Sequence, residues 1–176
     1  MEINRRIPWL VFKRTLKMFW PKQTLTEKPP IRSGTRSVFI RYLDAGSAND
    51  NEIEIVTLSN PFYDFERYGF RLVASPRHAD VLLVSLPLAR NMLEPARATF
   101  SAMPEPRRVI SIGDKGEDDS VFAGSYAIVP LPPDFTGKGY RHISARDQSG
   151  AEIFPPPAPD ILCALLERDL SVSPDK

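Results

Sequence analysis

Short apolar runs alternate with amphipathic stretches along most of the chain. Apolar runs of strand length, rich in valine, isoleucine and leucine, predict strands at 37–43, 70–74, 81–86 and 108–112, with a short one at 127–131. Apolar residues at helical spacing predict helices at 52–58, 90–102 and 159–170. Strands that alternate with helices predict an α/β domain with a mainly parallel sheet and helices on both faces.

A segment of different character precedes this domain. Between Pro8 and Pro21 the pattern predicts an amphipathic helix. Its apolar face and its cations together are Trp9, Phe12, Lys13, Arg14, Leu16, Lys17, Phe19 and Trp20. Aromatic rings beside cations suit a membrane surface, and a helix docked on a partner protein explains the pattern equally well.

Proline and glycine among polar residues predict an extended linker over 21–35. We therefore divide the chain into a basic amphipathic arm with its linker, 1–35, and an α/β domain, 36–176. Residues 130–153 form a polar insertion within that domain.

Charge is distributed unevenly. Up to Arg41 the chain has ten basic residues and two acidic ones, a net charge of +8, which leaves −7 for the rest of a chain whose total is +1. Such an arm suits an acidic partner: anionic lipid, an acidic subunit or nucleic acid. The apolar face between the cations favours membrane or protein, and we expect no nucleic acid.

The remaining composition sets further bounds. No run approaches the roughly 18 to 20 apolar residues that cross a bilayer, so we expect peripheral membrane contact or attachment through a partner. The one cysteine, Cys163, excludes a disulfide within the chain. Its apolar neighbours at helical spacing predict a buried packing role.

Residues 44–55 read Asp-Ala-Gly-Ser-Ala-Asn-Asp-Asn-Glu-Ile-Glu-Ile. This run resembles the ligand loop of the cluster-bearing small subunit of energy-converting hydrogenases and respiratory complex I, the NuoB-like family. The similarity continues through 60–69, 74–83, 103–114 and 121–126, and so covers roughly residues 37 to 129. It implies a flavodoxin-like core. It also implies a place between a hydrogenase-like large subunit and membrane subunits of antiporter-like or quinone-module-like type, on the cytoplasmic side of the inner membrane.

The resemblance also implies a [4Fe–4S] cluster held by four cysteines, and none of the four is present. Ala48, Asn51, Lys115 and Pro155 stand at the corresponding positions. Iron–sulfur clusters are held by thiolates, so we expect no cofactor, no metal and no catalytic residue at this site. The leading interpretation is a non-redox structural or coupling subunit of a membrane-associated complex. The alternatives are a redox subunit with atypical ligands, and an enzyme that binds a small ligand in the emptied pocket.

Other polar residues near the ligand positions have structural explanations. Asn49 or Asn51, each three residues before a glutamate, fits a helix-capping arrangement. Lys115 can fill the vacated volume and pair with Asp50 or Asp114. The acidic run 117–119 is a solvated loop or a site for a hard cation.

The chain shows neither a dinucleotide fingerprint nor a Walker pattern, and we interpret 136–138 as loop. Arg77 and His78 belong to a family motif and are interface candidates. Neither His78 nor His142 has a serine or cysteine nucleophile that the sequence alone places beside it.

Overall fold

The structure is a computed structural model that describes residues 37–47, 49–116, 120, 122–137, 139–146, 152–153 and 155–166. The predicted arm and linker, 1–35, lie outside the described residues. Within those ranges, no helix is long and apolar enough to cross a membrane.

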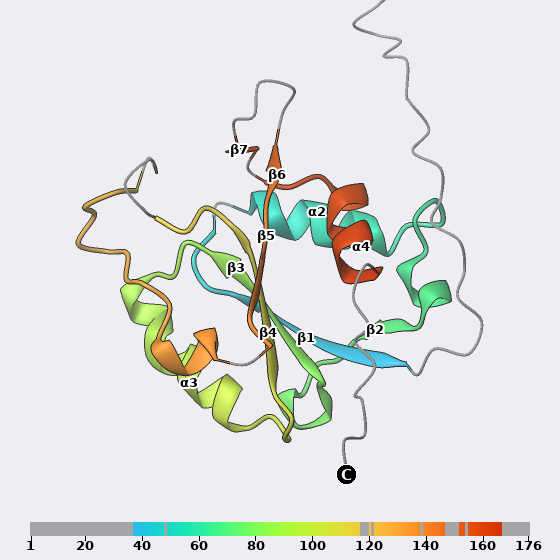
Figure 1. The fold of residues 1–176 in the computed structure, drawn as a ribbon, viewed down its shortest axis with the longest axis horizontal. Helices are drawn as coiled ribbons and strands as arrows, with labels where there is room; N and C mark the ends of the chain where they lie inside the picture. Colours follow the sequence, from blue (N-terminus) through green and yellow to red (C-terminus); the bar gives the residue numbers. More distant parts are fainter. Residues whose placement is uncertain are drawn as a thin grey trace, which may run out of the picture. The chain divides into compact units, whose positions relative to one another are not determined.

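Five parallel strands form the central sheet, in the order β2-β1-β3-β4-β5 (Figure 1). They are β1 (Val38–Asp44), β2 (Phe70–Leu72), β3 (Val81–Leu86), β4 (Arg108–Gly113) and β5 (Arg141–Ile143). A small antiparallel pair follows, β6 (Ala145–Arg146) with β7 (Glu152–Ile153). The strand order is the flavodoxin-like one, so the predicted fold class is confirmed.

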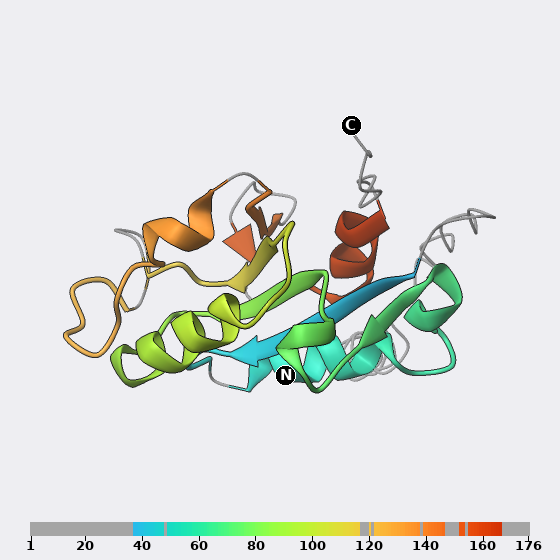
Figure 2. The ribbon, with the colours of Figure 1, turned by 90° about the horizontal axis from the view of Figure 1, so that it is seen from below.

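Helices cover both faces of the sheet. Two of them, α2 (Asp50–Leu58) and α4 (Ala158–Leu166), pack on one face, while α3 (Leu93–Ser101) and the 3-10 turn η4 (Pro133–Thr136) pack on the other. Figures 1 and 2 show α4 and α3 on opposite sides of the strands. The central strand β3 is buried along its whole length because both of its faces are covered.

Short 3-10 turns complete the connections: η1 (Phe65–Tyr68), η2 (Pro76–His78) and η3 (Arg90–Met92). The predicted helix 90–102 therefore begins as η3 and continues as α3. The predicted helix 159–170 is α4 over its described part, and residues 167–170 lie outside the described residues.

The strand predicted at 127–131 is wrong. Only an isolated bridge between Ala89 and Ile128 forms there, because the segment pairs with residues that follow β3 and not with a strand of the sheet. The fifth strand, β5, lies instead within the segment that we interpreted as a polar insertion. The same segment supplies Phe135 and Ile143 to the two cores.

Candidate functional site

The carboxyl ends of β1, β3 and β4 meet at one edge of the sheet, where open α/β folds place their ligands. Asp44 at the end of β1 is in register with Ser85 of β3, and Leu86 of β3 is in register with Gly113 of β4. The ligand-loop segment and the segment after β4 both leave from this edge. These segments therefore converge at one edge of the sheet.

A polar network lies between β1, β3 and α2. The Tyr42 hydroxyl donates to Glu52, and Ser85 Oγ lies 3.0 Å from Tyr42 and 3.3 Å from Asp44 Oδ1. Ser47 Oγ donates to both oxygens of Glu52 at 2.8 Å. Burial, followed by the hydrogen bond to Glu52, raises the pKa of Tyr42 above its usual range. Tyr42 is therefore a neutral donor that holds Glu52 in place.

The start of the loop after β1 is fixed by backbone contacts. Asp44 Oδ1 accepts hydrogen bonds from the amides of Gly46 at 2.9 Å and Ser47 at 3.1 Å. Gly46 has φ +125°, and a side chain on it would meet Ala89 Cβ at 2.7 Å. Only glycine fits so close to the segment after β3.

Asn51 fills the space between the ends of β3 and β4. Its side chain is 1% exposed, and its Nδ2 donates to the Leu86 carbonyl at 3.3 Å. Its Oδ1 is buried and has no hydrogen-bond partner among the described residues. Gly113 (φ +89°) leaves room for it, since a Cβ there would lie 2.6 Å from Asn51 Nδ2. The position that the resemblance assigns to a cluster ligand therefore holds a buried amide.

Both capping predictions are wrong. Asn49 is the residue that caps α2, but its backbone is left-handed (φ 69°) and its side chain makes no capping bond. Asn51 lies inside the helix and faces Leu86. Other partners explain part of this difference: Asn51 donates to Leu86, and Glu52 accepts from Tyr42 and Ser47.

The segment after β4 turns on Asp114. Its carboxylate accepts from the Gly116 amide at 2.8 Å and from Ser120 Oγ at 2.6 Å. Lys115 is exposed on this segment, so Asn51, not Lys115, fills the buried space. Pro155 lies half-buried just before α4, and Ala48 lies outside the described residues.

The donor chemistry at these positions does not fit a tetranuclear iron–sulfur cluster. Such a cluster needs soft, anionic sulfur ligands, whereas the residues present offer a neutral amide, an ammonium, a methyl group and a proline ring. Asn51 also has its amide engaged with Leu86. Cys163 is half-buried within α4 and so is less enclosed than the predicted packing role implied.

Other predicted residues are placed as follows. Arg77 and His78 are exposed on η2, and their role at an interface stays a prediction. Residues 117–119 lie outside the described residues. In the described part of the chain, no group of three or more histidine, cysteine, aspartate or glutamate side chains is placed to hold a metal ion.

Sequence reasoning missed a second polar cluster on the α3 side of the sheet. Ser111 Oγ lies 2.9 Å from His142 Nδ1 and 2.9 Å from the Tyr140 hydroxyl. Ser111 is fully buried and in direct register with His142 across β4 and β5. Burial, reinforced by Lys115, lowers the pKa of His142 to about 4, so the ring is neutral at pH 7. The cluster could not be predicted because strand β5, which places His142 beside Ser111, was not predicted.

Comparison with known proteins finds relatives among hydrogenase subunits. No family model matches the chain. Over 87 residues, 49% of the chain, it is 42% identical to the probable membrane-bound hydrogenase subunit mbhJ of Pyrococcus furiosus, and the match covers 52% of that protein. Over 93 residues, 53% of the chain, it is 38% identical to formate hydrogenlyase subunit 7 of Escherichia coli, of which 36% is covered. Its homologues are subunits of hydrogenase-type complexes.

The chain matches about half or less of the length of these curated relatives. A solved structure, the membrane-bound sulfane sulfur reductase, an archaeal respiratory membrane complex, contains a similar chain with a TM-score of 0.55 and 19% identity. The similarity covers 75% of this chain and 70% of that one. At this identity it supports the fold alone.

Proposed function

We propose that this protein is a structural, non-redox subunit of a membrane-associated complex related to energy-converting hydrogenases and complex I. The observation that carries the proposal is the buried Asn51 amide at a former ligand position, hydrogen-bonded to Leu86 between β3 and β4. The fold motifs are retained around it, while the thiolates are replaced by side chains with other partners.

The same account assigns partners and place. A hydrogenase-like large subunit and membrane subunits would contact the domain, as its homology to subunits of hydrogenase-type complexes supports. The basic arm, 1–35, would bind the cytoplasmic face of the inner membrane or a membrane subunit. In this proposal the subunit keeps its contacts with the partner subunits and no longer carries electrons. Electron transfer in the complex would therefore not pass through it.

Reconstitution tests the loss of the cluster. The full chain would be incubated anaerobically with ferrous iron and sulfide, desalted, and assayed for iron, acid-labile sulfide and visible absorption. The matched control is the quadruple variant A48C/N51C/K115C/P155C, which restores a thiol at each family position. We expect no cluster on the natural chain, and iron and sulfide in tetranuclear proportion on the control.

A tetranuclear cluster on the natural chain would overturn the proposal and favour a redox subunit with atypical ligands. If the control does not fold, the natural chain must still show no absorption band of an iron–sulfur cluster after the same treatment.

A further inference from the structure

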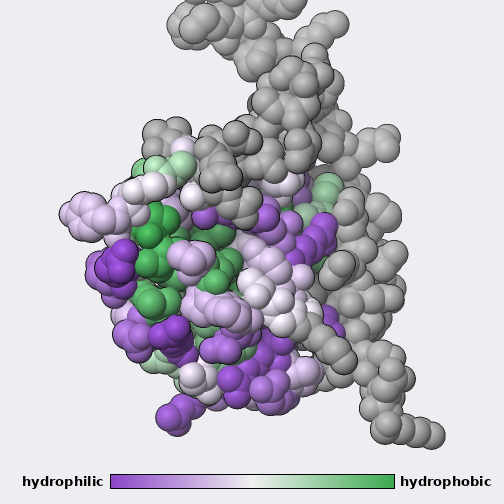
Figure 3. Space-filling model, turned by 60° about the vertical axis from the view of Figure 1, so that its left-hand side comes forward, coloured by the Kyte–Doolittle hydropathy of each residue, from purple (hydrophilic) through white to green (hydrophobic). Residues whose placement is uncertain are grey.

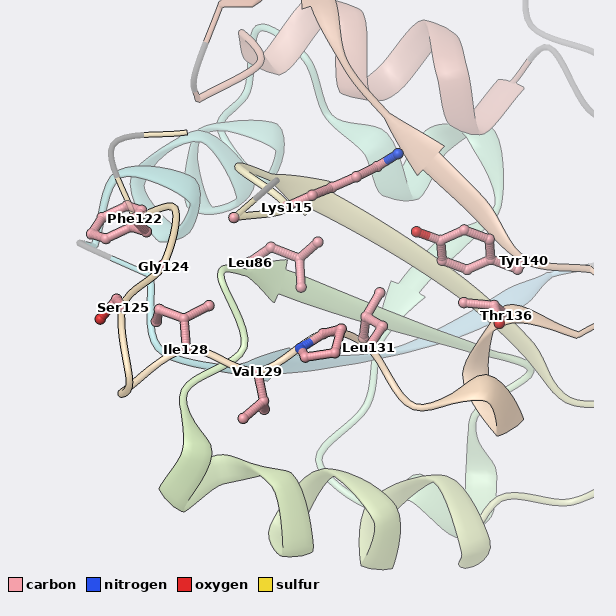
Figure 4. A pocket seen from close by; sticks show the side chains of 12 residues that line it. Leu86, Lys115, Phe122, Gly124, Ser125, Ile128, Val129, Leu131, Thr136 and Tyr140 are labelled. Carbon is pink, nitrogen blue, oxygen red and sulfur yellow. The ribbon is translucent and has the colours of Figure 1, made fainter. Parts of the chain in front are cut away.

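A cavity of about 510 Å³ opens beside the polar cluster of Ser111, Tyr140 and His142. It lies between the end of β3, the segment after β4 and the segment 122–131 (Figure 4). On the side of the domain that carries this segment, apolar residues gather with polar ones around them (Figure 3). The volume is in the range of small-molecule sites, roughly 300 to 1,000 Å³.

Most of the cavity wall is apolar. These residues are Leu86, Phe122, Ile128, Val129, Pro130 and Leu131. The amide of Val129 donates to the Leu88 carbonyl at 2.9 Å, and the amide of Arg90 donates to Ala127, so the segment is hydrogen-bonded along the end of β3. Of the positions that the resemblance assigns to cluster ligands, Lys115 lines the cavity, whereas Asn51 and Pro155 do not.

Polar side chains line the cavity on the side of β5, and Ser125 lines it on the side of Phe122. Lys115, Thr136 and Tyr140 line the cavity. In Figure 4 the Lys115 side chain extends toward β5, and the Tyr140 hydroxyl points inward from the same side, while Phe122 and Ile128 lie across the cavity. The Lys115 cation and the Tyr140 hydroxyl therefore lie toward β5, while Phe122 and Ile128, with Ser125 beside them, lie across the cavity.

The buried cluster determines what the Tyr140 hydroxyl can do. His142 Nε2 is buried without a hydrogen-bond partner in the part of the chain that the structure describes. Burying an unpaired ring nitrogen without a proton costs less free energy than burying an unpaired N–H. The neutral ring of His142 therefore carries its proton on Nδ1 and donates it to Ser111 Oγ. Ser111 then donates to the Tyr140 oxygen, which leaves the Tyr140 proton to donate into the cavity.

We propose that this cavity binds a small amphipathic carboxylate, with the carboxylate accepting from Tyr140 and facing Lys115, and an apolar body against Ile128 and Leu131. A hydrogen-bond donor beside a cation selects an anionic acceptor. The apolar wall selects a hydrocarbon or ring of moderate size. This inference goes beyond the proposed structural role and does not depend on it.

Octanoate is the probe. The control ligands are 1-octanol, which lacks the carboxylate charge, and acetate, which lacks the hydrocarbon chain. Affinity for the full chain would be measured by isothermal titration below the micelle threshold, and the site mapped by amide chemical shifts. We expect octanoate to bind best and to shift Ile128, Val129 and Leu131. We expect K115M to weaken octanoate binding roughly tenfold and Y140F to weaken it several-fold.

The matched control is R97M, which removes an exposed cation on α3 and should leave octanoate affinity unchanged. Thermal midpoints of all variants verify folding, and Lys115 is exposed, so K115M should fold. Equal affinity for octanoate and 1-octanol, unchanged affinity in K115M and Y140F, or shifts confined to residues outside the cavity would overturn the proposal. Absence of binding at millimolar octanoate would overturn it as well.

Discussion

Asn51 is a buried polar side chain whose hydrogen bonds are only partly satisfied. Its Nδ2 has the Leu86 carbonyl as acceptor, while its Oδ1 has no partner within the described ranges. An unsatisfied buried oxygen costs free energy of folding. The position therefore tolerates the amide without satisfying all of its hydrogen bonds.

Replacing Asn51 with alanine should destabilise the domain by about 1 to 3 kcal/mol, because the Leu86 carbonyl loses its donor and a small cavity remains. Urea unfolding of the full chain measures the change. Asn91, exposed on η3, provides the matched control in N91A, which should change the free energy of unfolding by less than about 0.5 kcal/mol. Equal effects of the two substitutions would contradict the assigned role.

His142 should make stability depend on pH. Its pKa is lowered from 6.5 to about 4 by burial, so the unfolded chain takes up a proton before the folded one does. The free energy of unfolding should therefore fall as pH decreases from about 6.5 to 4, by on the order of 1 to 2 kcal/mol after allowance for partial exposure.

Unfolding at several pH values checks this effect of His142. The variant H142Q should flatten the slope, while H78Q, which changes an exposed histidine on η2, should keep it. A slope that survives H142Q would show that other groups cause it.

At the scale of elements, α2 and α4 are joined by one charged contact. Glu54 of α2 accepts from the Ala158 amide at the start of α4 at 2.7 Å. A carboxylate at a helix N-terminus satisfies a free amide and interacts favourably with the helix dipole. Glu54 therefore joins the start of α4 to α2.

We expect E54A to lower the free energy of unfolding by about 1 kcal/mol, and E54Q by less, because glutamine keeps an acceptor oxygen. Thermal and urea unfolding give the measurement. Glu94, whose pair with Arg97 is on the surface of α3, supplies E94A as a control with a change near zero. A larger loss in E94A than in E54A would refute the capping role.

The arm leads to a separate prediction at this scale. Replacing Trp9, Phe12, Phe19 and Trp20 with alanine should detach the protein from membranes or from its complex, because the apolar face is removed while the cations remain. Co-sedimentation with vesicles containing anionic lipid, and co-purification with partners, distinguish the two attachments. Retention of both in the variant would contradict the assignment of the arm.

The elements differ in how far the sequence determines them. The bounds of β3 were predicted because six consecutive apolar or small residues suit a strand buried on both faces. The three-residue strand β5 was missed because Ile143 is its only apolar residue, and so no alternation could be seen. Helix caps were mispredicted because Glu52 and Asn51 found tertiary partners, which a local pattern does not encode.

At the scale of the whole molecule, the same sheet edge has two sides with different chemistry. On the α2 side, carboxylates and Asn51 lie at the ends of β1, β3 and β4. On the α3 side, the cavity is lined by Tyr140, which belongs to the polar cluster with Ser111 and the neutral His142. The first could be predicted from motif positions, whereas the second required the register of β4 with β5.

We propose that the subunit keeps the fold of its relatives and holds no iron–sulfur cluster in the assembled complex. The most direct measurement is iron and acid-labile sulfide in the complex isolated from native membranes, with subunit composition determined on the same sample. We predict a stoichiometric complex containing a hydrogenase-like large subunit, with no cluster assignable to this chain. A tetranuclear cluster located in this chain would contradict the account.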